Sequence, residues 1–155
     1  MLTRLDAEFA AAMSATGLDQ HFSFISALSG GADSTALCLL MARYAAASNK
    51  AHRAIIVDHG IRPDASVEAA RVAIRMQAHG IAVTIEKVSD KAPKTGIQAW
   101  ARRQRFDIML AHARRDNAVL LLGHHAGDQA ETIAMRLGKE SGLAGLAGMK
   151  RTSWR

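Results

Sequence analysis

Cysteine is nearly absent from this sequence of 155 residues, in which Cys38 is the only one. A single thiol cannot form an intrachain disulfide, a CxxC redox pair or a thiolate metal cluster. Because Cys38 lies within an apolar segment, we expect it to be a buried helix residue. The sequence therefore excludes the function classes that depend on several cysteines.

Long hydrophobic runs are also missing. Apolar residues make up 49% of the chain, but charged residues interrupt them throughout. No stretch approaches the roughly 20 apolar residues that a membrane-spanning helix needs. The N-terminal residues carry Asp6 and Glu8 among alanines, without the basic region and apolar run of a signal peptide. We therefore expect a soluble, cytoplasmic protein with no membrane partner.

The length and charge of the chain set two further bounds. A chain of 155 residues is long enough for one substantial core and too short for two independent ones. The net charge of +6 favours an anionic partner such as nucleic acid, although basic surfaces also occur without one. Nothing in the sequence indicates an oligomeric state.

Short apolar runs alternate with segments of helical periodicity along the chain. The predicted strands are residues 22–28, 54–57, 81–88 and 118–122, and the predicted helices are residues 35–47, 66–78, 97–115 and 128–137. The expected apolar stripe of the second of these helices consists of Val67, Ala70, Ile74 and Ala78, continuing to Ile81. This alternation predicts an α/β fold with a Rossmann-like parallel sheet, helices on both faces and ligands at the carboxyl ends of the strands.

The last part of the chain has a different composition. Glycines recur after residue 137, and the final residues are strongly basic. We predict a nucleotide-binding catalytic domain over residues 1–137 and a glycine-rich linker over residues 138–155 that leads toward a further C-terminal region.

A glycine turn follows the first predicted strand directly, in the segment ALSGGADS at residues 27–34. Paired glycines let the backbone approach an anion, while hydroxyl groups and the N–H groups of the next helix donate hydrogen bonds. The chain has neither GxxxxGK[ST] nor GxGxxG, so a Walker-type loop and a dinucleotide fingerprint do not apply. The carboxylate of Asp33 beside phosphates would require a cation such as Mg²⁺. A plain turn with a helix cap is the alternative.

In this context SGGADS resembles the SGGxDS signature of the PP-loop ATP pyrophosphatase superfamily, whose members cleave ATP between the α and β phosphates. The resemblance implies the adenine nucleotide α-hydrolase-like version of the fold. Three further segments are similar to one branch, the tRNA(Ile)-lysidine synthases: VDHGIR at 57–62, IQAWARRQRF at 97–106 and GHHAGDQAET at 123–132. The following RLGKESGLAGLAGM is similar to that branch's RLxRGSGxxGLxGM, so the matches extend to Met149.

This resemblance implies an ATP-dependent carbon–nitrogen ligase that acts on the wobble cytidine of an isoleucine tRNA with a CAU anticodon. Cytidine would be adenylated at its C2 oxygen, and the ε-amine of free lysine would then displace AMP. Adenylation makes chemical sense because a carbonyl oxygen leaves poorly, whereas AMP is a good leaving group. The implied cofactors are ATP and Mg²⁺, and the implied partners are the tRNA and lysine.

The resemblance also assigns residues to roles. The phosphates would be held by Ser29, Gly30, Gly31, Ala32, Asp33 and Ser34, with Asp33 near Mg²⁺, and the adenosine would be bordered by Ala27, Val57, Asp58 and His59. The reacting cytidine and lysine would be faced by His124, His125, Asp128 and Glu131, with Asp128 a second metal candidate. Contacts with tRNA or substrate would come from Arg62, Arg102, Arg103 and Lys139. The sequence does not separate metal binding, lysine binding and proton transfer within the histidine-acid group.

Each group has a purely structural alternative. His125, Asp128 and Glu131 would also suit the start of a helix, where acidic residues complement the helix dipole. The segment around Asp58 could be a solvated strand end, and the arginines of residues 102–105 a solvated helix face.

Two positions depart from the family's pattern. Gly127 stands where HHxDDQxET has its first aspartate, and Glu140 replaces the first glycine of RGSG. The first change removes a carboxylate and the second adds negative charge, so both are expected to weaken binding of a magnesium-pyrophosphate group.

Two other functions remain as alternatives. One is another PP-loop enzyme, either a tRNA thiolase or an amide-forming synthetase. Thiolases use several cysteines, which this chain lacks, and synthetases usually lack the HHxxDQxET block. The other is a nucleotide-binding module without catalysis, or a fragment, because the family's C-terminal extension is not present in these residues.

Overall fold

The computed structural model describes residues 3–126, 129–136 and 152–154, and the side chains of residues 3–123. Its sheet has the strand order β3-β2-β1-β4-β5-β6. The first four of these are parallel neighbours: β1 (Ser23–Ala27), β2 (Ala51–Asp58), β3 (Val83–Lys87) and β4 (Val119–Ala126). The predicted parallel sheet of four strands is therefore confirmed, with β1 and β2 at its centre.

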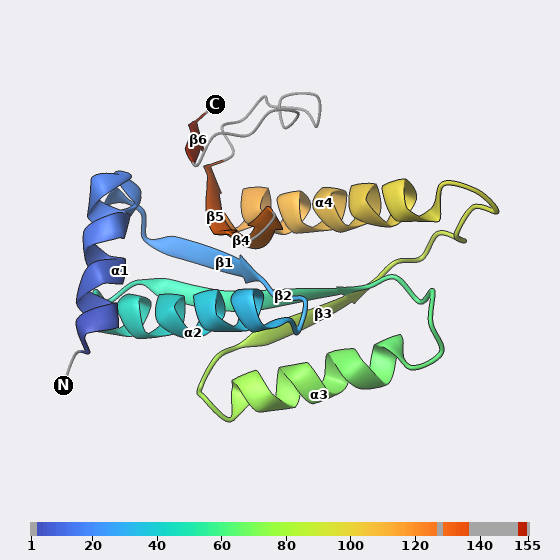
Figure 1. The fold of residues 1–155 in the computed structure, drawn as a ribbon, viewed down its shortest axis with the longest axis horizontal. Coiled ribbons are helices and arrows are strands. Elements are labelled where there is room, and N and C mark those ends of the chain that lie inside the picture. Colours follow the sequence, from blue (N-terminus) through green and yellow to red (C-terminus); the bar gives the residue numbers. More distant parts are fainter. Residues whose placement is uncertain (1–2, 127–128, 137–151, 155) are drawn as a thin grey trace.

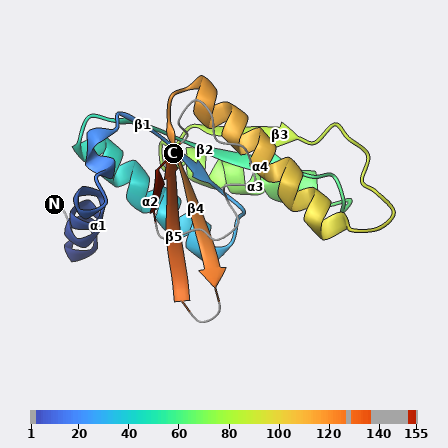
Figure 2. The same cartoon turned by 90° about the horizontal axis from the view of Figure 1, so that it is seen from above.

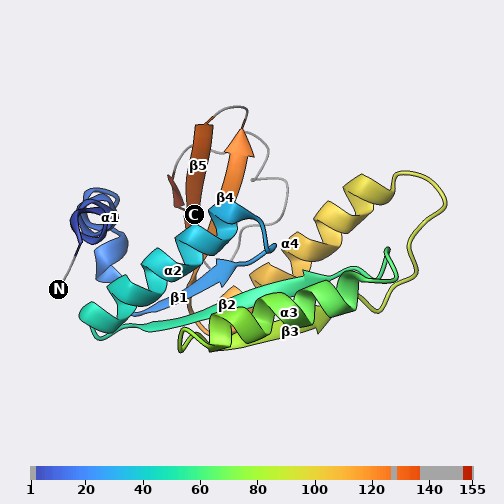
Figure 3. The same cartoon turned by 60° about the horizontal axis from the view of Figure 1, so that its bottom comes forward.

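Helices cover both faces of this sheet, as predicted (Figures 1 and 2). One face carries α1 (Arg4–Ala15), the short 3₁₀ turn η1 (Leu18–Gln20), α2 (Ala32–Ala47) and α3 (Ala65–Gln77). The other face carries α4 (Ile97–Arg115). Figure 3 shows α2 and α3 in front of the strands and α4 behind them. Among the described helices, none has the length and apolar character to cross a membrane.

Successive side chains of each strand point to opposite faces of the sheet, so apolar clusters form on both faces. On the α4 side, Ile25 and Ile55 pack with Phe106 and Met109. On the opposite side, strand residues of the other parity, such as Phe24, pack against α1 and α2. A third cluster joins α2 and α3 to β2 and includes Cys38, which has no exposed surface. Burial raises the pKa of the Cys38 thiol to about 11, so this cysteine is the inert core residue that its sequence context predicted.

The predicted stripe of α3 is wrong within the helix, although its last member, Ile81 beyond the helix end, is buried as predicted. Val67 and Ile74 are exposed, the latter by 65%. The helix instead buries Ala69, Ala73 and Met76 against β2. The buried face thus combines two small alanines, which let the helix approach the sheet, with the long side chain of Met76.

The helix predicted over residues 128–137 is also wrong where the structure describes it. Residues Gln129–Arg136 form β5, which runs antiparallel to β4, and Thr152–Trp154 forms β6, parallel to β5. Without β5, one side of β4 would be an open sheet edge with unpaired N–H and C=O groups. Pairing with β5 gives these groups hydrogen-bond partners. The β-branched Thr132 and Ile133 suit a strand, and Ile133 pairs in register with Leu122.

Candidate functional site

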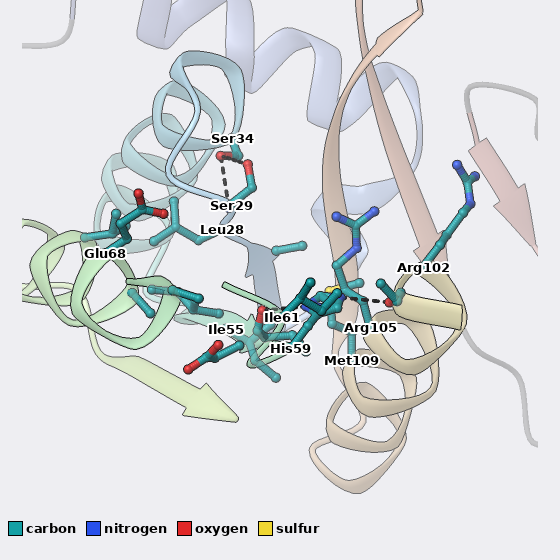
Figure 4. A pocket seen from close by; sticks show the side chains of 18 of the residues that line it. Leu28, Ser29, Ser34, Ile55, His59, Ile61, Glu68, Arg102, Arg105 and Met109 are labelled. Carbon is teal, nitrogen blue, oxygen red and sulfur yellow. Dashed lines mark hydrogen bonds between the residues drawn. The ribbon is translucent and has the colours of Figure 1, made fainter. Parts of the chain in front are cut away.

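The carboxyl ends of β1, β2 and β4 open into a pocket of about 560 Å³ (Figure 4). Its floor is formed by the end of β1 and the two residues after it (27–29), by the end of β2 and the residue after it (55–59), and by Leu122 and Gly123 of β4. Helix α3 provides one wall and the N-terminal half of α4 provides the other. The pocket therefore lies where parallel α/β sheets bind their ligands.

The turn between β1 and α2 depends on Gly30. Its φ of +87° lies in the left-handed region, which residues with a side chain rarely adopt. A Cβ at this position would also lie 2.9 Å from Cγ2 of Val72 on α3. Both the backbone angle and the available space therefore require glycine, and the turn brings main-chain N–H groups to the end of the pocket.

Two serine hydroxyls hold this turn in a closed arrangement. Ser34 Oγ donates to the Gly31 carbonyl at 3.1 Å and accepts from the Ser29 N–H at 3.2 Å. The two hydroxyl oxygens are 3.0 Å apart, and the Gly31 N–H reaches Ser29 Oγ at 3.4 Å. Gly31 caps α2 without a side chain, so the positive end of the helix dipole opens onto the turn. The turn thus has the arrangement of N–H groups, hydroxyls and helix dipole that favours an anion.

The end of β4 lies directly against this turn. A Cβ added to Gly123 would be 3.2 Å from both the N and the Cα of Ser34, which is tighter than ordinary van der Waals contact. Gly123 therefore lets two backbones approach each other closely. This contact joins the GHH segment of the sequence to the first turn of α2.

The carboxylate of Asp58 is buried and organises the loop that follows β2. One oxygen accepts the Gly60 N–H at 2.9 Å, and the other accepts the Ser66 hydroxyl. The hydrogen bond from Ser66 is the main reason that the pKa of Asp58 lies below its ordinary value. Asp58 lines the pocket, but its hydrogen bonds connect β2 to the start of α3, so it is not a solvated strand end.

His59 bridges from β2 to the opposite wall of the pocket. Its Nε2 lies 2.8 Å from the Ala101 carbonyl oxygen in α4, and its Nδ1 lies 3.3 Å from the Val57 carbonyl oxygen. Burial, together with the nearby charge of Arg105, lowers the pKa of His59 below its usual value. At the shorter of the two distances, Nε2 donates its N–H to Ala101, because a carbonyl oxygen can only accept.

Helix α4 brings two guanidinium groups to the pocket, Arg102 and Arg105 (Figure 4). Burial and the neighbouring charge of Arg102 lower the pKa of Arg105. Among residues 3–123, the ion pairs do not include Arg105. In contrast, Arg62 at the pocket mouth pairs with Glu68 at 2.6 Å. A largely buried cation without a carboxylate partner makes this wall of the pocket attractive to an anionic ligand.

Eight residues selected from the sequence line this pocket: Ala27, Ser29, Ser34, Val57, Asp58, His59, Arg62 and Arg102. The remaining loop residues form the turn and the first turn of α2: Gly30, Gly31, Ala32 and Asp33. Arg103 points away from the pocket: its side chain is 75% exposed and lies 3.8 Å from Asp107. The sequence interpretation treated Arg105 only as part of a basic face, although its spacing of three from Arg102 places both on one side of a helix.

The histidine-acid group is described only in its backbone. His124 and His125 lie in β4 and Glu131 in β5, where His124 pairs in register with Glu131. Asp128, Gly127, Lys139 and Glu140 lie outside the described residues. Among the side chains that the structure does describe, no three His, Cys, Asp or Glu residues converge on a metal site.

This anion-binding turn, pocket and strand order define a nucleotide-binding α/β domain, and the chain belongs to the PP-loop domain family, which matches residues 1–155. Membership of this family implies that the chain uses ATP. Curated relatives named tRNA(Ile)-lysidine synthase include one from Novosphingobium aromaticivorans, 42% identical over 128 residues, which are 82% of this chain and 38% of the relative. The Zymomonas mobilis protein is 43% identical over 125 residues, 80% of this chain and 37% of the relative.

A third relative of the same name, from Mesorhizobium japonicum, is 37% identical over 140 residues, which are 86% of this chain and 31% of the relative. The chain is thus a PP-loop domain that is similar to part of these tRNA(Ile)-lysidine synthases, and it spans about a third of the length of the curated relatives that it matches.

Proposed function

We propose that the pocket binds ATP with Mg²⁺ and that the chain is the nucleotide-binding part of an enzyme that converts the wobble cytidine of a CAU-anticodon tRNA(Ile) to lysidine. The observation that carries the proposal is that the glycine turn and Arg105 lie on the same pocket, where Arg105 forms no ion pair with any described side chain. We also retain residues 1–137 as the catalytic domain and residues 138–155 as a linker.

In this proposal, each wall of the pocket holds a different part of ATP. The turn over residues 29–34 and the N-terminus of α2 bind phosphate oxygens through N–H and hydroxyl groups. The apolar surface of Leu28, Ile56 and Val72 supports the adenine ring, with the adenosine bordered by the end of β2. Arg105, with Arg102 beside it, balances the negative charge that an anionic ligand brings into the pocket.

Asp33 suits a magnesium site by its chemistry. It lies in the first turn of α2 and directly precedes Ser34, so a carboxylate and hydroxyls, both hard oxygen donors, belong to the same short segment. Mg²⁺ commonly uses one or two carboxylates together with substrate phosphates, and Asp128 is the second candidate. When bound, the ion would supply charge neutralisation for the pyrophosphate leaving group.

The proposed reaction has two steps. The C2 oxygen of cytidine attacks the α-phosphorus of ATP, and the bond to the β-phosphate breaks with release of pyrophosphate. The lysine ε-amine then attacks C2, loses a proton and expels AMP, which carries away the original oxygen. We place His124, His125, Asp128 and Glu131 near the reacting groups, where a general base would accept that proton. Arg62, Arg103 and Lys139 are our candidates for contact with the tRNA.

A thiolase function has less support. Cys38 is the only cysteine, has no exposed surface and has a pKa raised to about 11. A buried protonated thiol neither carries sulfur nor binds a cluster.

Calorimetric titration with ATP and Mg²⁺ tests the binding part of the proposal. We expect Arg105→Gln to weaken ATP binding about 10- to 100-fold, as loss of a charge-assisted hydrogen bond predicts. Arg103→Gln is the matched control, because it removes the same charge from the same helix outside the pocket. Asp33→Ala should likewise weaken magnesium-dependent binding more than His79→Ala, which changes an exposed residue. Equal effects within either pair would contradict the proposed site.

Mass spectrometry tests the reaction. An unmodified CAU-anticodon tRNA is incubated with the protein, ATP, Mg²⁺ and lysine, with lysine omitted in the control. A lysine-dependent gain in tRNA mass supports lysidine formation, whereas ATP binding without any mass gain under all conditions favours a non-catalytic nucleotide-binding module.

A further inference from the structure

The two halves of α4 are held in different ways. Its buried residues begin at Phe106 and continue through Met109, Leu110 and Ala113. The first nine residues, Ile97–Arg105, contain no fully buried side chain, yet they include the pocket residues Gln98, Ala101, Arg102 and Arg105. The core anchors α4 only from Phe106 onward, including the pocket residue Met109, and Arg102 and Arg105 lie over the Phe106 ring at the start of this anchored part. The turn before Phe106 therefore receives less positional restraint from the core than the rest of the helix.

His59 provides a polar connection to this half of the helix. Its Nε2 lies 2.8 Å from the Ala101 carbonyl oxygen, while the backbone of His59 directly follows the end of β2. Ala101 immediately precedes Arg102, and its carbonyl oxygen faces the turn that continues to Arg105. A hydrogen bond at this carbonyl therefore acts on the turn that carries both arginines (Figure 4).

The direction of this hydrogen bond is fixed by its acceptor. The Ala101 carbonyl oxygen can only accept, so Nε2 of His59 is the donor. A second connection to this half of α4 comes from Gln104, which donates to Asp90 at 2.9 Å, but both of these groups are exposed. The His59 hydrogen bond is partly buried, so water competes with it less.

We propose that His59 is a positioning residue that holds the pocket-facing turn of α4 so that Arg105 meets the phosphates of the bound nucleotide. This inference rests on the proposed function, in which Arg105 contacts ATP. His59 also lines the pocket, and the positioning effect is the part of its contribution that passes through the helix by the hydrogen bond to Ala101. It follows that this part of the loss on removing His59 should be seen only while Arg105 is present.

A double-mutant cycle on the full chain tests this coupling, with the affinity for ATP and Mg²⁺ measured by calorimetry. We expect His59→Leu to weaken binding about 5- to 20-fold in the wild-type background and less than about 2-fold in the Arg105→Gln background. His59→Gln should restore most of the affinity, because its Nε2 can donate over a similar reach, whereas the shorter His59→Asn should not. Urea unfolding of each variant separates loss of affinity from loss of fold.

The outcomes separate the two hypotheses. If the wild-type chain does not bind ATP, or Arg105→Gln binds it as well as wild type, the proposed function fails at this site. If Arg105→Gln weakens binding but His59→Leu does not, or weakens it equally in both backgrounds, His59 does not act through Arg105. Failure of His59→Gln to restore affinity, with the fold intact, also contradicts the positioning role.

Discussion

At the scale of single residues, Gly30 and Gly60 separate two costs of adding a side chain. At Gly60 the only cost is backbone strain, whereas at Gly30 the new side chain would also clash with α3. Both have positive φ angles, +87° and +64°, but a Cβ at Gly60 would meet nothing within 4 Å, whereas one at Gly30 would meet Val72 at 2.9 Å. We expect Gly60→Ala to lower the free energy of unfolding by about 1 kcal/mol and Gly30→Ala by about 2–4 kcal/mol.

Urea unfolding measures both values. Val72→Ala in the Gly30→Ala background should recover the part of the loss that exceeds that of Gly60→Ala. If the two glycine substitutions cost the same, the close approach of the turn to α3 does not contribute to stability.

His52 predicts a specific dependence of stability on pH. Its ring nitrogen lies 2.9 Å from the buried Ser26 hydroxyl, and burial lowers the pKa of His52 from 6.5 to about 4. Between these values the unfolded chain binds a proton that the folded chain does not, so stability decreases as the pH falls from 6.5 to 4. The full difference is up to about 3 kcal/mol.

Denaturant unfolding of wild type and His52→Gln across this pH range checks the prediction. Glutamine can keep a hydrogen bond to Ser26 but does not titrate, so the difference between the two stability curves isolates His52 from the carboxylates. Parallel curves between pH 6.5 and 4 would show that His52 does not titrate in this way.

At the scale of elements, the buried face of α3 leads to a prediction opposite to that of its sequence pattern. Ile74 is 65% exposed, and Met76 is 1% exposed in the cluster with β2. Met76→Ala should therefore lower the free energy of unfolding by about 2–4 kcal/mol, and Ile74→Ala by less than about 0.5 kcal/mol. Thermal or urea unfolding of the pair decides between the two faces, since a larger effect at Ile74 would support the sequence pattern.

The elements also show where the sequence was informative. Strands β1, β2 and β4 were predicted because strands buried on both faces read as continuous apolar runs. The edge strand β3, which is only half-buried, was predicted from alternation over residues 81–88. The turn of residues 29–34 was predicted because its glycines and serines act locally. By contrast, the pairing of β5 with β4 and the packing of α3 depend on neighbours that are distant in sequence. The same is true of the site: the connection from His59 to Ala101 spans 42 positions, and no local spacing predicts it.

At the scale of the whole molecule, the chain covers 38% of the N. aromaticivorans relative. Selecting one tRNA requires many separated contacts with phosphates and bases, most of which one small domain occupied by ATP does not reach. We therefore expect these 155 residues alone to bind ATP but to form little or no lysidine, and to attract tRNA in a way that weakens as salt rises.

Appending the part of that relative beyond the matched segment should raise lysine incorporation by about tenfold or more, measured by mass spectrometry of the tRNA. Gly127→Asp should raise it further if the missing carboxylate limits the reaction. Efficient lysine-dependent modification by the 155 residues alone would contradict this prediction and show that Gly127 is tolerated.

The close contact between Gly123 and the Ser34 backbone affects which residues around the pocket can change during evolution. Two main chains touch there without any side chain between them, so the spacing between the phosphate turn and the end of β4 does not depend on which side chains follow Gly123. Residues beyond position 123 can then be exchanged during evolution while the nucleotide stays at the same place relative to the strand. Related domains could thus acquire new acceptor chemistry by changing one strand end, provided that glycine remains at the crossing.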